Sequence, residues 1–415
     1  MKAIGVNITK YDYDAIIVGA GPAGSTMARI LAQSGREVLV IDKRKDIGSP
    51  VRCGEGLGQR EVIGQRLDLP KEVISTEILG AKVIAPNGKS IVWKSENTKG
   101  WVLERKMFDK WLAELAVHKG AEVRAYTRAV DLVKKDGKIN GVRIEKYGSD
   151  PYDVAAPLVV SAEGMEAHIA RLAGFKTVHN LYDVDTCYQY EMQPCEHENL
   201  IELYFGNEIA PRGYVWLFPK KDKKANIGIG IGGSVAKWKK NSGIMGADPK
   251  LLLDDFIAKN DMLRDSSTLL NFGGIISVGA PLDKFVDDNF MVIGTAAKQV
   301  DPIHGGGIAL AMEAGIMAAK IANEAMEKSD FSKQTLYQYE KTWRAGPGKK
   351  VGKRLLLRKV MEHVSDDDLN HIFNTITQND LDLIMRGQFA NPVAKVLVGR
   401  PQLLGVLKAL VSIGT

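Results

Sequence analysis

Three glycines near the start of the chain have the spacing of a dinucleotide-binding turn. Gly19, Gly21 and Gly24 follow a short apolar run at residues 15–18 and open an amphipathic, helix-like segment. In such a turn the first glycine permits the bend, the second lets the backbone approach a pyrophosphate, and the third lets the helix pack on the strand. Asp42 ends the next apolar run, where an acid would accept hydrogen bonds from ribose hydroxyls. The pattern predicts a site for a dinucleotide without a 2′-phosphate.

A second glycine-led segment lies far downstream and bears on the choice of cofactor. Residues 290–294 are strand-like, and Gly305-Gly306-Gly307 precedes a helix-like segment that continues to about residue 328. The N-terminus of a second helix can supply backbone N–H groups to the flavin end of an extended FAD. The first turn alone does not distinguish an NAD site from an FAD site, whereas the two turns together favour FAD. We interpret His304, inside the second turn, as a residue that positions backbone rather than as an acid.

Two further groups of side chains could take part in chemistry. Cys53 lies in a loop over residues 43–56 that is rich in glycine and proline and begins beside the nucleotide site. A free cysteine is usually a small buried hydrophobe. Tyr214, Trp216 and Phe218 alternate along one strand-like run, so their side chains point to one face of a sheet. Such a row either packs on a core or lines an apolar cavity.

The surrounding elements are predicted from their patterning. A hairpin is expected over residues 82–93, a helix over 107–119, and a buried parallel strand over 157–161. Alternating runs between residues 186 and 277 predict an inserted antiparallel sheet, and helices dominate after residue 331. The predicted domain boundaries are 1–75, 100–180 and 278–330 for the nucleotide domain, 76–99 and 181–277 for a substrate domain, and 331–415 for a helical domain.

Composition is that of a globular chain with two or three structural units. The 415 residues are 45% hydrophobic and 26% charged, with a net charge of +6. Cys53, Cys187 and Cys195 show neither metal-ligand spacing nor an even disulfide framework, so we predict reduced thiols and no metal site. We expect no signal peptide, and no run reaches the ~18 apolar residues of a membrane-spanning helix. The sequence predicts a cytoplasmic protein without a nucleic-acid partner.

Four blocks give the chain a resemblance to the geranylgeranyl reductase family of FAD proteins. The family belongs to a wider class that includes p-hydroxybenzoate hydroxylase. The blocks are the first glycine turn with Asp42, the loop Pro50-Val51-Arg52-Cys53-Gly54-Glu55-Gly56, the strand Tyr214-Val215-Trp216-Leu217-Phe218-Pro219-Lys220, and the turn from Asp301 to Ile308. The loop and the Tyr-x-Trp-x-Phe-Pro block are specific to these reductases. The resemblance implies an α/β fold with an FAD-binding Rossmann-like domain of the glutathione reductase type, an inserted antiparallel-sheet substrate domain and a helical C-terminal region.

The resemblance also implies roles for individual residues. The implied FAD contacts are Gly19, Gly21, Ala23, Gly24, Asp42, Cys53, Gly54, Gly56, Arg105, Val130, Thr295, Gly307 and Ile308. The implied catalytic residues are Cys53, Tyr214 and Trp216, and the implied substrate cavity is lined by Tyr214, Trp216, Phe218 and Lys220. Two positions depart from the wider class, which usually has aspartate in place of Thr295 and of Glu163. Loss of a carboxylate at Thr295 should weaken FAD binding by ~1–3 kcal/mol.

The implied activity is the saturation of C=C bonds in geranylgeranyl chains of archaeal ether-lipid (digeranylgeranylglycerophospholipid) precursors, with ferredoxin or NAD(P)H as electron donor. Such chemistry needs an acid at the flavin, for which Cys53 and Tyr214 are the candidates. Basic residues at 220–224 or 349–359 are either a cationic mouth for the lipid phosphate or a solvated face. The apolar tail at 393–413 is either a peripheral contact with lipid or a helix packed on the protein's own core.

Two other functions fit the same sequence. An FAD monooxygenase shares the fold, but it would need oxygen, so an anaerobic assay separates it from a reductase. A non-catalytic isoprenoid-lipid-binding relative is conceivable because of Thr295 and Glu163. Purified protein that stays colourless with added FAD would favour that alternative.

Overall fold

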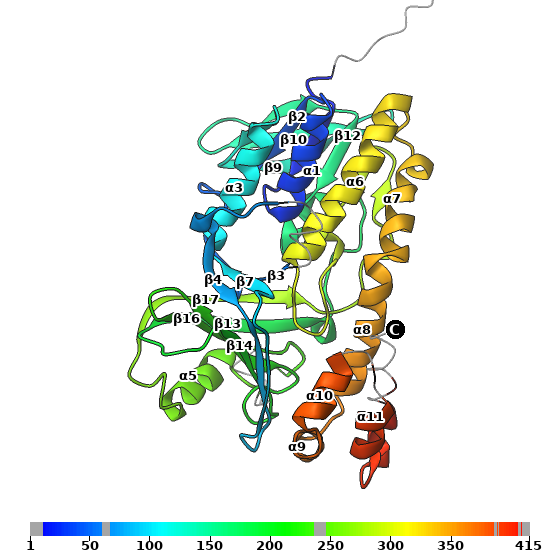
Figure 1. Cartoon of the computed structure of the whole chain (residues 1–415). Coiled ribbons are helices and arrows are strands. Elements are labelled where there is room, and N and C mark those ends of the chain that lie inside the picture. The colour runs from blue at the N-terminus through cyan, green and yellow to red at the C-terminus, as the bar shows by residue number, and fades with distance from the viewer. Residues whose placement is uncertain are drawn as a thin grey trace, which may run out of the picture.

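The computed structural model describes residues 11–59, 67–235, 246–385, 388, 390–405 and 408. In Figure 1 an α/β unit lies above a broad sheet, and helices from the end of the chain flank that sheet. The α/β unit has a six-stranded sheet of order β18-β19-β12-β1-β2-β8. Its strands are β1 (Ala15–Val18), β2 (Val38–Ile41), β8 (Glu122–Arg124), β12 (Leu158–Ser161), β18 (Val286–Asp287) and β19 (Phe290–Val292).

The centre of this sheet is parallel and buried on both faces. β1 pairs in parallel with β2 and β12, and every residue of these three strands is buried. Apolar runs with no polar alternation suit strands that are covered on both sides. The parallel strand predicted at residues 157–161 is therefore confirmed, and its last residues carry the chain to the edge where the first glycine turn also lies.

Three helices pack side by side on this unit, with α1 (Pro22–Gln33) between α3 (Arg105–Val117) and α6 (Ile308–Lys328) (Figure 1). α1 and α6 can approach closely because Gly315 has no Cβ; a Cβ there would lie 2.5 Å from the carbonyl oxygen of Ala23. The long helix predicted after Gly307 is confirmed. A three-stranded meander of β9 (Thr127–Lys135), β10 (Lys138–Lys146) and β11 (Tyr152–Ala155) contacts β2 and β12.

The inserted sheet has seven strands in the order β17-β13-β16-β15-β14-β5-β6. They are β5 (Gly80–Ile84), β6 (Ser90–Lys94), β13 (Val184–Gln193), β14 (Leu200–Tyr204), β15 (Tyr214–Lys220), β16 (Lys224–Gly232) and β17 (Ser267–Ser277). The predicted antiparallel pairings and the β5–β6 hairpin are confirmed. β5 and β14 pair in parallel, because β5 reaches this sheet from a hairpin far upstream in the chain.

The two faces of the inserted sheet have different surroundings. One face packs against α5 (Pro249–Lys259) through a core that includes Leu217, Ile227, Ile229 and Leu253. The alternate residues of β15 and β16 point the other way, toward the α/β unit, since side chains alternate along a strand. A small sheet of β3 (Gly56–Gly58), β4 (Ile74–Ile78) and β7 (Gly100–Leu103) connects the two units.

After α7 (Lys333–Ala345), which packs on α6, the chain continues as helices, as predicted. These are α8 (Pro347–Met361), α9 (Asp366–Thr375), α10 (Gln378–Met385) and α11 (Ala390–Leu397). α8 is tied to the inserted sheet by Arg358, whose Nη2 lies 2.7 Å from Asp185 Oδ1. Positions 406, 407 and 409–413 of the predicted apolar tail lie outside the described residues. No helix in the described part of the chain is long and apolar enough to cross a membrane.

Candidate active site

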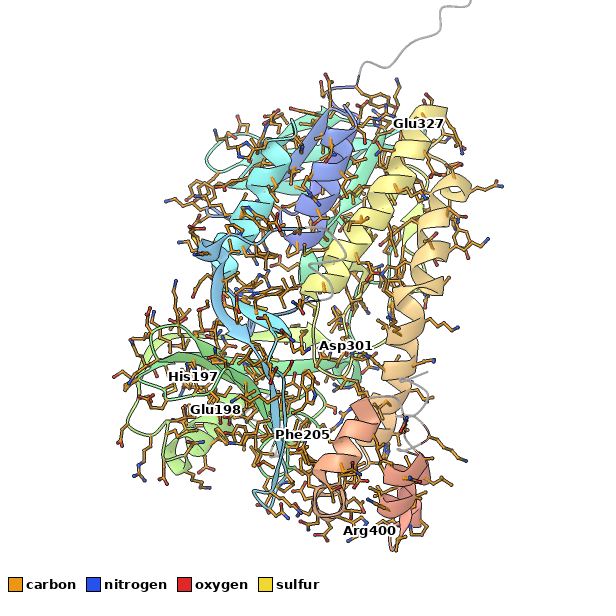
Figure 2. All side chains as sticks on the ribbon, in the orientation of Figure 1. His197, Glu198, Phe205, Asp301, Glu327 and Arg400 are labelled. Atoms are coloured by element: carbon orange, nitrogen blue, oxygen red, sulfur yellow. The ribbon has the colours of Figure 1, made fainter. Side chains whose placement is uncertain are left out.

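One large cavity lies between the α/β unit and the inserted sheet. Its volume is about 2450 Å³, and it is lined by both glycine turns, the Cys53 loop and one face of β15. In Figure 2 the label Asp301 marks where the second turn meets the inserted sheet and α8. Of the residues proposed from the sequence, those that line the cavity are Gly19, Gly21, Ala23, Asp42, Cys53, Gly54, Gly56, Arg105, Val130, Tyr214, Trp216, Phe218, Thr295, Gly307 and Ile308. Gly24 and Lys220 do not line it.

Each glycine of the first turn has different surroundings, which explain why a side chain is absent there. Gly19 has φ +111°, and a Cβ there would lie 2.4 Å from the carbonyl oxygen of Ala162. A Cβ at Gly24 would lie 2.0 Å from the carbonyl oxygen of Gly19, so this glycine lets α1 lie against β1. A Cβ at Gly21 would meet nothing within 4 Å and would project into open space. Gly21 therefore leaves room for a ligand, whereas Gly19 and Gly24 serve the fold.

Asp42 stands beside this turn at the end of β2. Its Oδ2 accepts a hydrogen bond from Ala20 N at 2.9 Å, and its Oδ1 accepts one from Arg44 N at 2.8 Å. These contacts fix the carboxylate at the cavity wall, and each oxygen keeps a second lone pair. The group is thus placed to accept hydrogen bonds from ribose hydroxyls.

The N-termini of α1 and α6 both line the cavity. Their N-cap residues, Gly21 and Gly307, make no side-chain capping bond. The first N–H groups of a helix have no partner within it, and the macrodipole makes this end positive. Two uncapped ends at one cavity fit an anionic, extended dinucleotide such as FAD.

The Cys53 loop rests on the inserted sheet through side chains from three strands. Gln189 Nε2 on β13 donates to the carbonyl oxygen of Cys53 at 3.3 Å, and Asn226 Nδ2 on β16 donates to that of Gly54 at 3.3 Å. A Cβ at Gly54 would lie 2.9 Å from the ring of Phe218 on β15. The loop and the aromatic strand therefore hold a fixed position relative to each other.

The aromatic side of the cavity is a row on β15. Ring centroids are 5.9 Å apart for Tyr214 and Trp216, and 6.4 Å apart for Trp216 and Phe218. Opposite Trp216 on β16 is Gly228, where a Cβ would lie 2.2 Å from the indole, so the ring can lie flat on the sheet. The indole Nε1 donates to Gln189 Oε1 at 2.9 Å, which satisfies its one polar group.

The prediction that Lys220 lines the substrate cavity is not supported by its position. Its side chain is 4% exposed, and its Nζ lies 2.9 Å from Glu55, 3.0 Å from Glu104 and 3.0 Å from Glu191. Burial alone would lower the pKa of Lys220, but the charges of Glu55 and Glu104 raise it. The lysine is an ionic anchor behind the Cys53 loop.

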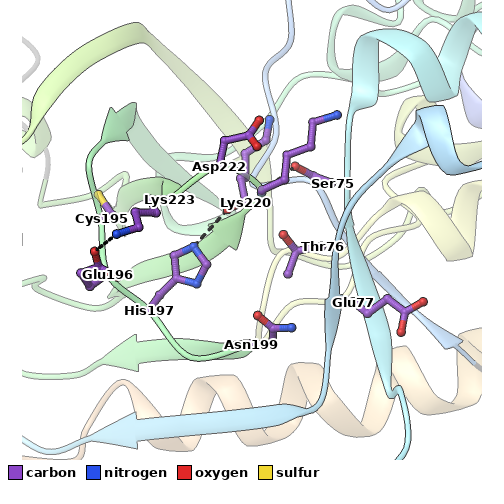
Figure 3. A pocket seen from close by; sticks show the side chains of 11 residues that line it. Ser75, Thr76, Glu77, Cys195, Glu196, His197, Asn199, Lys220, Asp222 and Lys223 are labelled. Atoms are coloured by element: carbon purple, nitrogen blue, oxygen red, sulfur yellow. Dashed lines mark hydrogen bonds and ion pairs between the residues drawn. The ribbon is translucent and has the colours of Figure 1, made fainter.

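Lys220 also borders a second, small pocket of about 430 Å³ (Figure 3). Figure 3 shows His197 hydrogen-bonded to Lys220 and Lys223 paired with Glu196 on its rim. Lys221 and Lys223 line this pocket and not the large cavity. Of the two basic runs considered from the sequence, it is the one on α8 that reaches the large cavity, through Lys349, Lys350, Lys353 and Arg354.

Comparison with known proteins identifies the family. The profile of the geranylgeranyl reductase catalytic domain matches residues 183–276, and that of FAD dependent oxidoreductases matches residues 14–201. A digeranylgeranylglycerophospholipid reductase from Methanococcoides burtonii is 40% identical over 88% of this chain and 87% of its own. One from Methanothrix thermoacetophila is 36% identical over 96% and 99%. The chain belongs to the geranylgeranyl reductase family.

A solved structure gives the same result for the fold. A geranylgeranyl bacteriochlorophyll reductase-like protein from Thermoplasma acidophilum is 33% identical, covers 94% of this chain and 99% of its own, and superposes with a TM-score of 0.84. The predicted fold class, the family and FAD as the cofactor are thereby confirmed.

The departure from the wider flavoprotein class at Glu163 has a structural explanation. The Glu163 carboxylate accepts hydrogen bonds from the backbone N–H groups of His168 and Ile169 and from the Ser161 hydroxyl. It therefore caps α4 (His168–Leu172), and its longer side chain is used by the fold. Thr295 lines the cavity, and a Cβ at Gly307 would lie 3.6 Å from its Oγ1.

Asp301, His304 and Arg354 fix the second glycine turn, and of these only Arg354 was not singled out from the sequence as part of the turn. Asp301 accepts from Ile303 N at 2.9 Å and pairs with Arg354 on α8. Burial alone would raise the pKa of Asp301, but its hydrogen bond to His304 and the charge of Arg354 lower it far below its usual value. His304 Nδ1 accepts from Gly306 N at 3.1 Å, so the backbone-positioning interpretation of His304 agrees with its contacts.

Gln189 and Asn226 were also missed as members of the site. Both are almost fully buried: Gln189 stands between two tyrosines on β13, and Asn226 stands between an alanine and an isoleucine on β16. Gln189 lines the cavity, and Asn226 is not among its lining residues. An amide inside a strand-like run is the signal that could have identified both, because buried amides need partners.

Proposed function

We propose that this protein is an FAD-dependent reductase that saturates the isolated C=C bonds of geranylgeranyl chains in digeranylgeranylglycerophospholipid precursors. The observation that carries the proposal is that one cavity joins two uncapped helix N-termini to a floor of aromatic and glycine residues. The first part suits a flavin dinucleotide, and the second suits an apolar chain. The relatives named for this activity match this chain over most of its length.

Reduced FAD, when bound, supplies a hydride. An isolated alkene has no carbonyl group that could stabilise the carbanion left by hydride addition alone, so the protein must provide a proton and keep water out. We propose the Cys53 thiol as the donor of this proton. Its Sγ accepts a hydrogen bond from Glu55 N at 3.2 Å, and the residue lines the cavity beside Gly54.

Tyr214 is the weaker candidate for this acid. Its hydroxyl donates to the carbonyl oxygen of His304 at 2.8 Å, and burial raises its pKa strongly. A phenol that is harder to ionise gives up its proton less readily. We therefore assign Tyr214 to the cavity wall and to the support of the second glycine turn.

Arg105 provides a fixed charge near the proposed acid. Its guanidinium makes two hydrogen bonds with Asp109, at 2.9 and 2.8 Å, and lines the cavity. Burial alone would lower the pKa of Arg105, but Asp109 and Cys53 raise it, so the group stays cationic. We propose that Arg105 contacts FAD beside the Cys53 loop.

We further propose ferredoxin or NAD(P)H as the electron donor and a peripheral contact with the membrane. The membrane proposal follows from the substrate, since a two-chain lipid must leave a bilayer to reach the cavity. Lys349, Lys350 and Lys353 line the cavity from α8 and suit an anionic lipid surface or headgroup.

The test of the function is an anaerobic reaction. Purified protein, FAD, a chemical reductant and a geranylgeranyl ether lipid are combined without oxygen, and the molecular mass of the lipid is measured by mass spectrometry. We expect the lipid to gain two hydrogen masses for each double bond reduced. A gain of oxygen that needs air would identify a monooxygenase, and an unchanged lipid with bound FAD would favour a non-catalytic lipid-binding protein.

A further inference from the structure

The second glycine turn is attached to the C-terminal helices, α8 to α11. Figure 1 shows α8 between α7 and the group of α9, α10 and α11, beside the inserted sheet. Three consecutive residues of the turn, Asp301, Pro302 and Ile303, each contact these helices. The contacts join parts of the chain that are more than fifty positions apart. The turn that faces the cavity on one side is therefore attached to a separate group of helices on the other.

Two of the attachments come from arginines on α8. The Asp301 carboxylate pairs with Arg354, and the Pro302 carbonyl oxygen accepts a hydrogen bond from Arg358 Nη1 at 3.0 Å. Arg354 and Arg358 are four residues apart in one helix, so their side chains lie on the same face of it. One face of α8 thus contacts two adjacent residues of the turn.

Arg358 is itself fixed by the inserted sheet. Its Nη1 and Nη2 lie 3.2 and 2.7 Å from the two carboxylate oxygens of Asp185 on β13, and its Nε donates to Glu362 at 3.1 Å. Arg358 is 8% exposed and Asp185 is 7% exposed. A bidentate pair fixes the plane of a guanidinium as well as its position. Arg358 therefore joins β13, α8 and the second turn at one point.

The third attachment is apolar. The side chain of Ile303 packs against the hydrophobic core of the C-terminal helices, which includes Leu357 on α8, Val396 on α11 and Leu403. This contact carries no charge, so it can be removed without leaving a buried ion unpaired. The turn is thus attached to the same helices by ionic and by apolar contacts.

The attached residues are bonded directly to the glycines that open α6. Asp301 N donates to the carbonyl oxygen of Gly306 at 3.0 Å, and Gly305 N donates to that of Asp301 at 2.9 Å. A movement of Asp301 would therefore move the glycines that precede the N-terminus of α6. That N-terminus, with Gly307 and Ile308, lines the cavity.

We infer that Arg358 is a positioning residue for FAD, and that the C-terminal helices set the position of the second glycine turn through Arg358, Arg354 and Ile303. Within the described part of the chain Arg358 does not line the cavity, so it acts through the turn. Reduction adds negative charge to the flavin, and N–H groups at the positive end of a helix favour negative charge. A displaced turn should therefore weaken the binding of reduced FAD more than that of oxidised FAD. The inference rests on FAD as the cofactor and not on the identity of the lipid substrate.

The test uses two variants that detach the turn in different ways. Arg358→Met removes the hydrogen bond to Pro302 and the pair with Asp185, and Ile303→Ala removes the apolar contact. Arg400→Met is the matched control, because Arg400 pairs with Asp368 at 2.9 Å within the C-terminal helices. In Figure 2 Arg400 lies at the far end of these helices from Asp301.

Three quantities are measured on the full chain. They are the dissociation constant of FAD from flavin fluorescence, the midpoint potential of bound FAD from equilibration with redox dyes, and the backbone hydrogen exchange of residues 301–307 in FAD-free protein. Thermal unfolding checks that each variant is folded. The potential separates positioning of the flavin from a loss of stability, because a uniform loss of FAD affinity does not change it.

We expect Arg358→Met to raise the dissociation constant of FAD ~10-fold and Ile303→Ala to raise it ~3-fold. Both should lower the midpoint potential and speed exchange in the FAD-free turn. If reduced FAD is weakened ~10-fold more than oxidised FAD, the potential falls by ~30 mV. Arg400→Met should lower the thermal midpoint and leave the three quantities unchanged.

An unchanged potential, or unchanged exchange in the turn, in both folded variants would overturn the inference. Equal changes in Arg400→Met would also overturn it, because they would reflect a general loosening of the helices. If Arg358→Met does not fold, Ile303→Ala decides by the same criteria. No lipid is needed, so a response here with no lipid reduced in the anaerobic assay would reject the proposed function alone. Reduced lipid without such a response would reject the positioning role alone.

Discussion

Replacement of Lys220 by methionine tests the ionic anchor behind the Cys53 loop. The ammonium lies within 3.0 Å of three carboxylates, and its side chain and that of Glu55 are 4% and 5% exposed. Methionine keeps much of the apolar stem but removes the charge, so Glu55, Glu104 and Glu191 would face one another without a cation. Removal of one partner from a buried ion pair typically costs ~3–5 kcal/mol. Because Glu104 and Glu191 are partly exposed, at 27% and 19%, we expect the lower end, ~3 kcal/mol.

The loss should depend on pH with a defined sign. Burial alone would raise the pKa of Glu104, but its hydrogen bond to Ser75 and the charge of Lys220 lower it in the folded protein. A carboxylate with a lowered folded-state pKa contributes stability above its unfolded pKa of ~4.3, and this stability is lost as the pH falls through the folded value. Without Lys220 the part of this contribution that comes from its charge disappears, so the deficit of the variant should be largest near neutral pH and shrink as the pH falls below ~4.3.

Urea unfolding of the FAD-loaded protein at several pH values measures this loss. The matched control is Lys223→Met, because Lys223 pairs with Glu196 at the surface, where the two side chains are 65% and 72% exposed. Exposed pairs contribute ~0–1 kcal/mol. If Lys220→Met were no more destabilising than Lys223→Met, or if its deficit grew as the pH fell, the assignment of Lys220 as an ionic anchor would be wrong.

Three further predictions concern the cavity. Gly21→Ala should weaken FAD binding but leave the thermal midpoint of the FAD-free protein unchanged, because the added Cβ meets no protein atom. Gly24→Ala should lower that midpoint, because its Cβ would meet the carbonyl oxygen of Gly19; the reverse pattern would contradict a ligand role for Gly21 and a packing role for Gly24. Gly228→Ala places a Cβ 2.2 Å from the Trp216 indole, so we expect retained FAD and at least ~10-fold slower turnover by initial rates, and normal turnover would show that the ring position does not matter. Gln189→Leu removes both the hydrogen bond to the Cys53 carbonyl and the one from the Trp216 indole, so it should slow turnover less in a Cys53→Ala background than in the natural protein; an equal effect in both would indicate that Gln189 acts through Trp216 alone.

The sequence was sufficient wherever function depends on local backbone or on strand alternation. Gly19, Gly21 and Gly24 sit in one short turn, so their spacing predicted the turn, and the structure distinguishes the open position at Gly21 from the two close approaches. Tyr214, Trp216 and Phe218 alternate on one strand, so their common face followed from a period of two, and they line one cavity.

The sequence was not sufficient where the function depends on what lies opposite in space. Lys220 follows the aromatic row by two residues and shares its face, but three carboxylates from other segments surround its Nζ. The parallel pairing of β5 with β14 joins segments that are far apart in the chain, and local patterning does not encode it. The same is true of Arg354, which reaches Asp301 from α8.

The central claim is that a single FAD lies between the N-termini of α1 and α6 with its reactive ring over the aromatic floor. A crystal structure of the protein with FAD tests it most directly. We predict one FAD per chain, with its pyrophosphate against the backbone at Gly21 and its ring between Gly307 and the Cys53 loop. A dinucleotide that contacts only one of the two helices, or whose ring lies away from Trp216, would contradict the account.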